Sequence, residues 1–201
     1  MEKTISNKKQ SVNKAHTANS VKIYDIVITG LMAALVFVGT YFFKIPTSFG
    51  YTHLGDCMII LTVCMFGTRK GVLAGAIGAG LSDLLGGYTV WVLPTMLFKG
   101  IWALIMGIVT YKLLPKVKFN WLIGASVGAL VHIALYTLIK IPLYGMEYAL
   151  LRIPIITGQT ICGIVFGSAL YMFIKSSGIL RNVKLFTKKG EEVNEFKKRG
   201  I

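Results

Sequence analysis

Apolar residues dominate the chain between Ile26 and Ile174, and single charged residues interrupt them at intervals. Several of the charge-free runs are too short to cross a bilayer alone, because a transmembrane helix needs about 20 residues. Joining the runs across single charges predicts six helices, at 23–44, 54–67, 71–85, 92–114, 119–140 and 150–175. Gly67–Gly71 and Lys112–Lys118 form the predicted turns of two helical hairpins.

Composition places the chain among membrane proteins. Of its 201 residues, 54% are hydrophobic and 15% charged, and the mean hydropathy is +0.66, well above an ordinary soluble domain. The predicted fold class is therefore an all-α membrane protein with six transmembrane helices and Gly-rich helix packing. Residues 1–22 and 177–201 read as polar and basic cytoplasmic tails, and residues 23–176 as the membrane domain.

The net charge of +14 has a topological explanation. Six spans place both tails on one side, together with the two hairpin turns, and that side holds all but four of the 22 basic residues. Because cytoplasmic loops are enriched in Lys and Arg, both termini are predicted to be cytoplasmic in a multi-pass protein of the cell membrane. Basic residues in tails and short loops do not form the folded basic surface that nucleic acid requires.

Two aspartates of the first hairpin are predicted to lie at one depth. Asp56 precedes Arg69 by thirteen residues and Asp83 follows Lys70 by thirteen. At 1.5 Å per residue both carboxylates lie about 20 Å above the cytoplasmic turn. That level is the outer third of a hydrocarbon layer about 30 Å thick.

The second hairpin repeats this count with a lysine and a histidine. Lys99 precedes Lys112 by thirteen residues, and His132 follows Lys118 by fourteen. An unpaired charge in lipid costs several kcal/mol, so a polar cavity that opens outward explains why the four groups share one depth. Alternatively, Asp56 and Asp83 are interfacial helix ends.

Four other ionisable residues are placed near the outer surface. Lys44 is predicted to end the first helix, Lys140 to end the fifth and Arg152 to begin the sixth, while Glu147 lies in the last outer loop. The alternative for the three basic residues is that their side chains snorkel to the interface as anchors.

Three outer segments, "FGYTHLGD", "GGYTVW" and "PLYGMEY", are rich in Tyr, Trp and Gly. An aromatic belt at the membrane interface explains them as well as a ligand site does. As a site, Gly lets the loops fold inward while aromatic rings stack on a flat ligand. The candidate substrate-binding residues are Tyr51, His53, Asp56, Asp83, Tyr88, Trp91, Lys99, His132, Tyr144, Glu147 and Arg152.

Small residues recur at fourfold spacing on the predicted helices. Gly71, Gly75 and Ala79 form one such stripe, and Gly124/Gly128 and Gly163/Gly167 repeat it. Small residues at this period let helix backbones approach closely in lipid. The first helix carries Gly30-x-x-x-Ala34, which is suited to an internal neighbour or to a separate membrane subunit.

Enzymatic activity is not expected. The sequence has no phosphate-binding loop of the type Gly-x-x-x-x-Gly-Lys-[Ser/Thr], no His-Glu-x-x-His and no Gly-x-Ser-x-Gly. The cysteines Cys57, Cys64 and Cys162 lack metal-site spacing and read as small core residues. Three classes remain: a binding subunit, a stand-alone carrier, and an integral membrane enzyme that uses Asp56, Asp83 and His132 in acid and base roles.

"YTHLGDCMIIL", "GVLAGAIGAGLSDLLGGY" and "WVLPTMLFKG" together resemble the S components of energy-coupling factor (ECF) vitamin transporters, in the riboflavin-type branch. The resemblance covers about 150 residues, from helix 1 to helix 6. It rests on three blocks: Leu54-Gly55-Asp56, Asp83-x4-Tyr88 and Pro94-x4-Lys99-Gly100.

The resemblance implies a six-helix subunit that binds a vitamin or vitamin precursor in an outward pocket, with hydroxymethylpyrimidine or a pyridoxine-like compound as the preferred ligand. It also implies a membrane T subunit and two cytoplasmic ATPases that use ATP, whereas this chain itself needs no cofactor or metal. Docking on the T subunit would use Gly30, Ala33 and Ala34. Family members often carry Ala-x-x-x-Ala there, so Gly30 is a departure.

Overall fold

Helices account for most of residues 23–47 and 50–178, the parts of the chain that the computed structural model describes. The first helix spans Ile23–Tyr41. The later helices are α2 (Gly55–Phe66), α3 (Thr68–Leu85), α4 (Val92–Ile108), α5 (Asn120–Tyr144), α6 (Met146–Leu151) and α7 (Ile153–Ser176). A short 3-10 helix, Thr89–Trp91, precedes α4, and a π-helical turn, Val109–Leu113, extends it. The helices pack within the compact unit Thr29–Met172.

The connection between the first helix and α2 is a β-hairpin, which the sequence analysis did not predict. Strand β1 (Lys44–Thr47) pairs antiparallel with β2 (Gly50–His53), with Lys44 opposite His53. Lys44 therefore lies in a strand, and the prediction that it ends the first helix is wrong. Pro46 accounts for this, because a proline disfavours helical geometry at the residue before it and lacks an N–H group.

The fifth helix is longer than predicted. It continues through Pro142 to Tyr144, and the chain turns at Gly145 with a φ of 88°. Lys140 is therefore an internal residue of α5 rather than its end. Arg152 lies between α6 and α7 and does not begin a helix as predicted.

Within residues 23–47 and 50–178, four helical stretches are long and apolar enough to cross a membrane: Ile23–Tyr41, Thr89–Leu113, Asn120–Tyr144 and Met146–Ser176. The six predicted helical segments are present, but this part of the chain does not contain six full spans. Helix α2 has 12 residues and is about 18 Å long, which is shorter than a typical hydrocarbon layer. The sidedness of the termini stays a prediction.

Glycines set the close contacts between helices, as the small-residue stripes predict. A Cβ added at Gly75 of α3 would meet the side chain of Ile59 of α2, and one at Gly78 would meet the first helix at Ala33 and Val36. On α7, a Cβ at Gly163 would run into Asp56. Helix α2 therefore packs closely against both α3 and α7, and α3 packs closely against the first helix.

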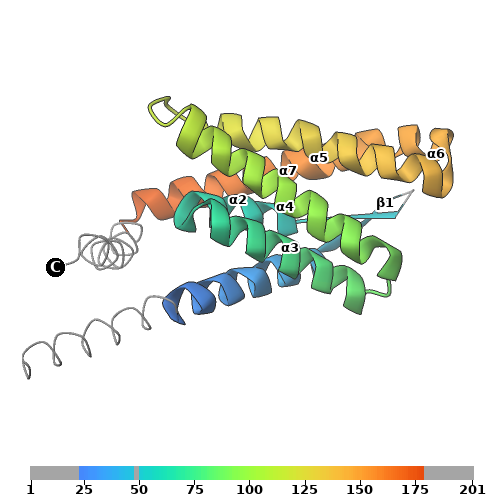
Figure 1. Cartoon of the computed structure of the whole chain (residues 1–201), viewed down its shortest axis with the longest axis horizontal. Coiled ribbons are helices and arrows are strands. Elements are labelled where there is room, and N and C mark those ends of the chain that lie inside the picture. Colours follow the sequence, from blue (N-terminus) through green and yellow to red (C-terminus); the bar gives the residue numbers. More distant parts are fainter. Residues whose placement is uncertain (1–22, 48–49, 179–201) are drawn as a thin grey trace, which may run out of the picture. The chain divides into compact units, whose positions relative to one another are not determined.

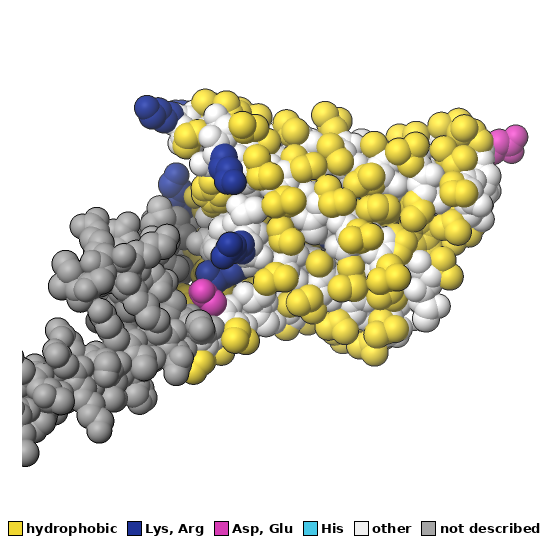
Figure 2. All heavy atoms as spheres, viewed as in Figure 1, with side chains coloured by type: hydrophobic (Ala, Val, Ile, Leu, Met, Phe, Trp, Pro, Cys, Tyr) yellow, Lys and Arg dark blue, Asp and Glu magenta, His cyan; other side chains and the backbone are white. Residues whose placement is uncertain are grey.

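The loops fall at two ends of the unit Thr29–Met172. Figure 1 shows β1, α6 and the segment between α3 and α4 at one end, and the α2–α3 turn with the α4–α5 connection at the other. The face drawn in Figure 2 is covered mainly by hydrophobic side chains, and Lys and Arg gather toward the end where α4 joins α5. This distribution suits a surface that faces lipid between two aqueous layers.

The orientation can be tested with single cysteines in a variant that lacks the three native ones. Glu147→Cys and Arg69→Cys place thiols at exposed positions at opposite ends of the unit. We expect a membrane-impermeant maleimide to label Cys at 147 in intact cells, and Cys at 69 only after the membrane is opened. Labelling of position 69 from outside would reverse the assignment.

Candidate functional site

A cavity of about 280 Å³ lies inside the unit Thr29–Met172. Its lining combines side chains from the first helix, β2, α3 and the later helices up to α7. Eight lining residues were predicted as site residues: His53, Asp83, Tyr88, Trp91, Lys99, His132, Tyr144 and Arg152. Eight others were not: Thr40, Thr95, Tyr136, Lys140, Tyr148, Ile155, Ile156 and Gln159.

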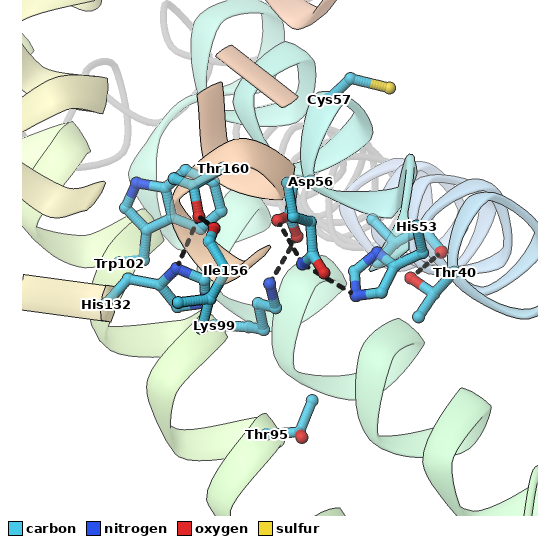
Figure 3. A network of polar contacts seen from close by, with 12 residues as sticks. Thr40, His53, Asp56, Cys57, Thr95, Lys99, Trp102, His132, Ile156 and Thr160 are labelled. Atoms are coloured by element: carbon cyan, nitrogen blue, oxygen red, sulfur yellow. Dashed lines mark hydrogen bonds and ion pairs between the residues drawn. The ribbon is translucent and has the colours of Figure 1, made fainter. Parts of the chain in front are cut away.

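The polar floor of this cavity is the set Asp56, Lys99 and Gln159, of which Lys99 and Gln159 line the cavity. A buried ion pair lies at its centre. Lys99 Nζ on α4 lies 2.5 Å from Asp56 Oδ1 on α2, and the two side chains are 2% and 0% exposed. Figure 3 shows them pointing toward each other, with His53 on one side and His132 with Trp102 on the other. Asp56 itself does not line the cavity, so it acts behind Lys99. Two charges removed from solvent are tolerated only when each neutralises the other and further hydrogen bonds are made.

Gln159 of α7 supplies those further hydrogen bonds. Its Nε2 donates to Asp56 Oδ2 at 3.0 Å and lies 3.2 Å from His53 Nε2, while Thr52 Oγ1 donates to Gln159 Oε1 at 3.2 Å. Burial lowers the pKa of the His53 imidazole to about 4, although the nearby Asp56 opposes this effect. His53 is therefore neutral at physiological pH, and its Nε2 accepts a hydrogen bond from Gln159 Nε2.

The local sequence explains how Asp56 reaches this position. Asp56 lies in the first turn of α2, where a carboxylate is favoured by the helix dipole. Gly55 packs against Thr40 of the first helix, and Gly163 leaves room for the Asp56 side chain beneath α7. Two glycines thus let three helices meet at one carboxylate.

His132 on α5 forms a second polar point of the cavity. Its ring stacks on Trp102 at a centroid distance of 4.7 Å, and Nδ1 lies 3.4 Å from Thr160 Oγ1. Thr160 already donates its hydroxyl proton to the Ile156 carbonyl at 2.7 Å, so a neutral His132 must donate from Nδ1 and keep a lone pair on Nε2. That Nε2 atom is buried and has no hydrogen-bond partner within residues 23–47 and 50–178. It is a ready acceptor for a donor group on a ligand.

Aromatic rings form one wall. Trp91 stacks on Tyr136 and on Tyr144, at centroid distances of 6.0 and 6.1 Å, and its Nε1 donates to the Tyr144 hydroxyl at 3.2 Å. Tyr136 donates its hydroxyl to Thr95 Oγ1 at 3.0 Å, which fixes the ring. Parallel fixed rings of this kind bind flat, unsaturated ligands.

Two predicted site residues whose side chains the structure describes do not line the cavity: Asp56, and Glu147, which is exposed on α6. The backbone of Tyr51 lies in β2, and its side chain falls outside the described residues. Asp83 and Lys99 both line the cavity, but the carboxylate bonded to Lys99 is Asp56. Of the docking residues, Gly30 and Ala34 are exposed, whereas Ala33 is buried against α3.

The residues missed by the sequence analysis carried two signals. Tyr136 and Lys140 follow His132 at positions i+4 and i+8, so helical periodicity places all three on one face of α5. Gln159 is an uncharged polar residue in a very apolar stretch, "IPIITGQTICG". Counting ionisable groups alone did not include it.

The fold and the cavity define an integral membrane protein with a cavity among its helices. The chain belongs to the family described as the ECF-type riboflavin transporter S component, whose family model matches residues 20–176. The resemblance noted in the sequence is thereby confirmed. The chain is an S component of the ECF vitamin transporters, a multi-pass protein of the cell membrane and not an enzyme.

The chain is also similar to two curated relatives and to one solved structure. An uncharacterised protein of Pyrococcus woesei is 33% identical over 134 residues, which is 65% of this chain and 86% of the relative. The thiamine precursor transporter HmpT of Lactococcus lactis is 28% identical over 165 residues, 81% of this chain and 94% of the relative. A solved S component of a bacterial ECF transporter has the same fold, with a TM-score of 0.65 at 17% identity, covering 77% of this chain and 97% of the other.

The buried ion pair predicts non-additive mutations. Lys99→Met leaves the Asp56 carboxylate buried without its counterion, and we expect it to destabilise the fold by about 3–5 kcal/mol. The double variant Asp56→Asn/Lys99→Met removes both charges and keeps an oxygen for Gln159, so it should be more stable than Lys99→Met alone. Thermal unfolding of the purified variants in detergent measures both, with Lys118→Met, an exposed lysine, as control. Additive losses would contradict a coupled pair.

Proposed function

We propose that this chain is the high-affinity substrate-binding subunit of an ECF-type importer for hydroxymethylpyrimidine or a pyridoxine-like compound. It works with a membrane T subunit and with two ATPases that supply the energy from ATP. The single observation that carries the proposal is a small cavity with a polar floor and an aromatic wall. The alternatives are a stand-alone carrier and, with less support, a membrane enzyme. Among the described residues, no comparable feature supports either of them.

The size of the cavity favours a compound with one ring. A volume of about 280 Å³ is slightly below the range of typical small-molecule sites, which is about 300 to 1,000 Å³. A tricyclic flavin with its sugar-alcohol chain needs more room than a substituted pyrimidine or pyridine. The Lactococcus lactis relative is a thiamine precursor transporter, which supports the same ligand class.

The polar groups also suit such a ring. His132 Nε2 offers a lone pair to an amino or hydroxyl group, and Lys99 offers protons to a ring nitrogen or an oxygen. Trp91 and Tyr136 offer flat surfaces on which the ring can stack. A substituted pyrimidine or pyridine presents a flat face, ring nitrogens and hydroxyl or amino donors together.

Calorimetry on the purified chain tests the ligand class. We expect hydroxymethylpyrimidine or pyridoxine to bind with one site per chain, and riboflavin to bind much more weakly. His132→Phe keeps a ring against Trp102 but removes the acceptor, and it should weaken binding about 10- to 100-fold. The matched control Lys118→Met should bind as the wild type does. Tight binding of riboflavin with no binding of either single-ring compound would refute the proposal.

The exposed face of the first helix is proposed to contact the T subunit. A Cβ added at Gly30 meets nothing within 4 Å, so Gly30→Leu should fold normally while adding bulk at a close helix contact. We expect this variant to lose co-purification with a T subunit and to keep ligand binding. Gly158→Leu on α7 is the control, since Gly158 is also exposed and has open space around it. Normal assembly of Gly30→Leu would exclude this face.

A further inference from the structure

Thr160 of α7 contacts a residue of the cavity wall without lining the cavity itself. It is 1% exposed and absent from the lining, whereas His132 on α5 belongs to the lining. Figure 3 shows the Thr160 hydroxyl group beside the imidazole of His132, where Oγ1 lies 3.4 Å from Nδ1. Thr160 can therefore act on a ligand through His132 and not by direct contact.

The hydroxyl group of Thr160 has one proton, and the geometry assigns it. Thr160 Oγ1 lies 2.7 Å from the carbonyl oxygen of Ile156, a typical O–H···O length, but 3.4 Å from His132 Nδ1. The proton takes the shorter contact, so the hydroxyl oxygen presents only lone pairs to the imidazole. A proton on Nδ1 makes this contact a hydrogen bond, whereas a bare Nδ1 would set one lone pair against another.

The imidazole is held in a neutral form and in a fixed position. His132 is fully buried, and within residues 23–47 and 50–178 neither of its nitrogens forms an ion pair with a carboxylate. Burying an unpaired cation costs far more than burying a neutral ring. The ring stacks on Trp102, whose Nε1 donates to the Ala125 carbonyl at 3.1 Å, and meets Tyr136 edge-on. Only the choice between the two neutral tautomers is then left open.

The tautomer decides which ligand groups the cavity accepts at this point. With the proton on Nδ1, the Nε2 atom of His132 is an acceptor, and it has no hydrogen-bond partner among the described residues. A ligand with an N–H or O–H group there satisfies a buried polar atom, whereas a carbonyl or ether oxygen there leaves two acceptors facing each other. Sites built around one hydrogen bond reject analogues that cannot make it.

We propose that Thr160 is a specificity-determining positioning residue. By accepting a hydrogen bond from Nδ1 of His132, it keeps the lone pair on Nε2 and selects ligands whose ring carries an amino or hydroxyl donor at that point. The proposal rests on the proposed function, because it keeps the single-ring ligand and adds which kind of hydrogen-bonding group of that ligand is recognised.

The tautomer can be observed without any ligand. Full-length protein labelled with ¹⁵N at histidine is studied by NMR in nanodiscs, and the signals of His132 are assigned by their loss in His132→Phe. We expect Nδ1 to show the shift of a protonated nitrogen and Nε2 that of an unprotonated one. Thr160→Val keeps the shape of the side chain but removes the hydroxyl, so it should abolish this single pattern. Thr160→Ser should retain it.

Calorimetry on the same protein measures the effect on ligand choice. The probes are hydroxymethylpyrimidine, pyridoxine and their analogues in which a methoxy group replaces one amino or hydroxyl donor at a time. We expect the loss of one particular donor to weaken binding of the parent compound about tenfold or more. This ratio of affinities should fall toward one in Thr160→Val and keep its wild-type value in Thr160→Ser.

Thr62→Val is the matched control. Thr62 of α2 is as buried as Thr160, donates its hydroxyl to the carbonyl of Met58 four residues earlier, and does not line the cavity. The variant removes a buried hydroxyl and should change neither the tautomer of His132 nor the ratio of affinities. An equal loss of the ratio in Thr62→Val and Thr160→Val would assign the effect to a general loosening of the bundle and overturn the proposal.

The outcomes separate this proposal from the proposed function. A proton on Nε2 of His132 in the wild type would overturn the proposal, whichever ligand binds, and this spectrum does not depend on how well any variant folds. An unchanged tautomer or an unchanged ratio in Thr160→Val would remove Thr160 from the role and leave the single-ring ligand standing. Absence of binding by both parent compounds would reject the proposed function and the ligand preference together.

Discussion

The contact between Lys99 and Asp56 is the constraint on which the rest of the structure depends. Two full charges with almost no exposure in an apolar helix bundle are stable only if they meet directly and if their remaining hydrogen-bonding capacity is used. That requirement fixes how α2, α4 and α7 meet, since each contributes one member of the Asp56, Lys99 and Gln159 set. The same requirement explains the glycines at positions 55 and 163, because a side chain at either position would push the helices apart.

The polar floor separates two kinds of surroundings within the helix bundle, the hydrophobic core and the cavity. Buried apolar residues such as Ile60, Val63 and Met106 form the hydrophobic core. Aromatic rings and single polar atoms line the cavity. Within the cavity, His132 differs from His53, because His53 is tied to Gln159 while the Nε2 atom of His132 has no partner in the described residues. His53 therefore has a structural role, whereas His132 keeps a hydrogen-bond acceptor for a ligand.

Much of this arrangement was accessible from the sequence, and the reasons for the failures are physical. Counting residues from the two predicted hairpin turns placed Asp56, Asp83, Lys99 and His132 at one depth, because the rise per residue of a helix is nearly constant. The count gives the depth of a residue but not the direction in which its side chain points around the helix axis. It therefore could not show that Asp56 rather than Asp83 contacts Lys99. The hairpin at Lys44–His53 was missed because its first strand continues an apolar run. Lys140 was predicted to end the fifth helix, whereas α5 continues past it to Tyr144.

The separation of the α5 face from the interlocked floor has an evolutionary consequence. Asp56, Lys99 and Gln159 each contact another member of the set or a neighbouring helix, so a change at one position demands compensation elsewhere. Lys140 faces the cavity from α5, and its ammonium lies over the rings of Trp91 and Tyr136. Substitutions there can be accepted one at a time without repacking the bundle. A lineage that keeps the floor can therefore acquire a new nutrient through a few changes on one helical face.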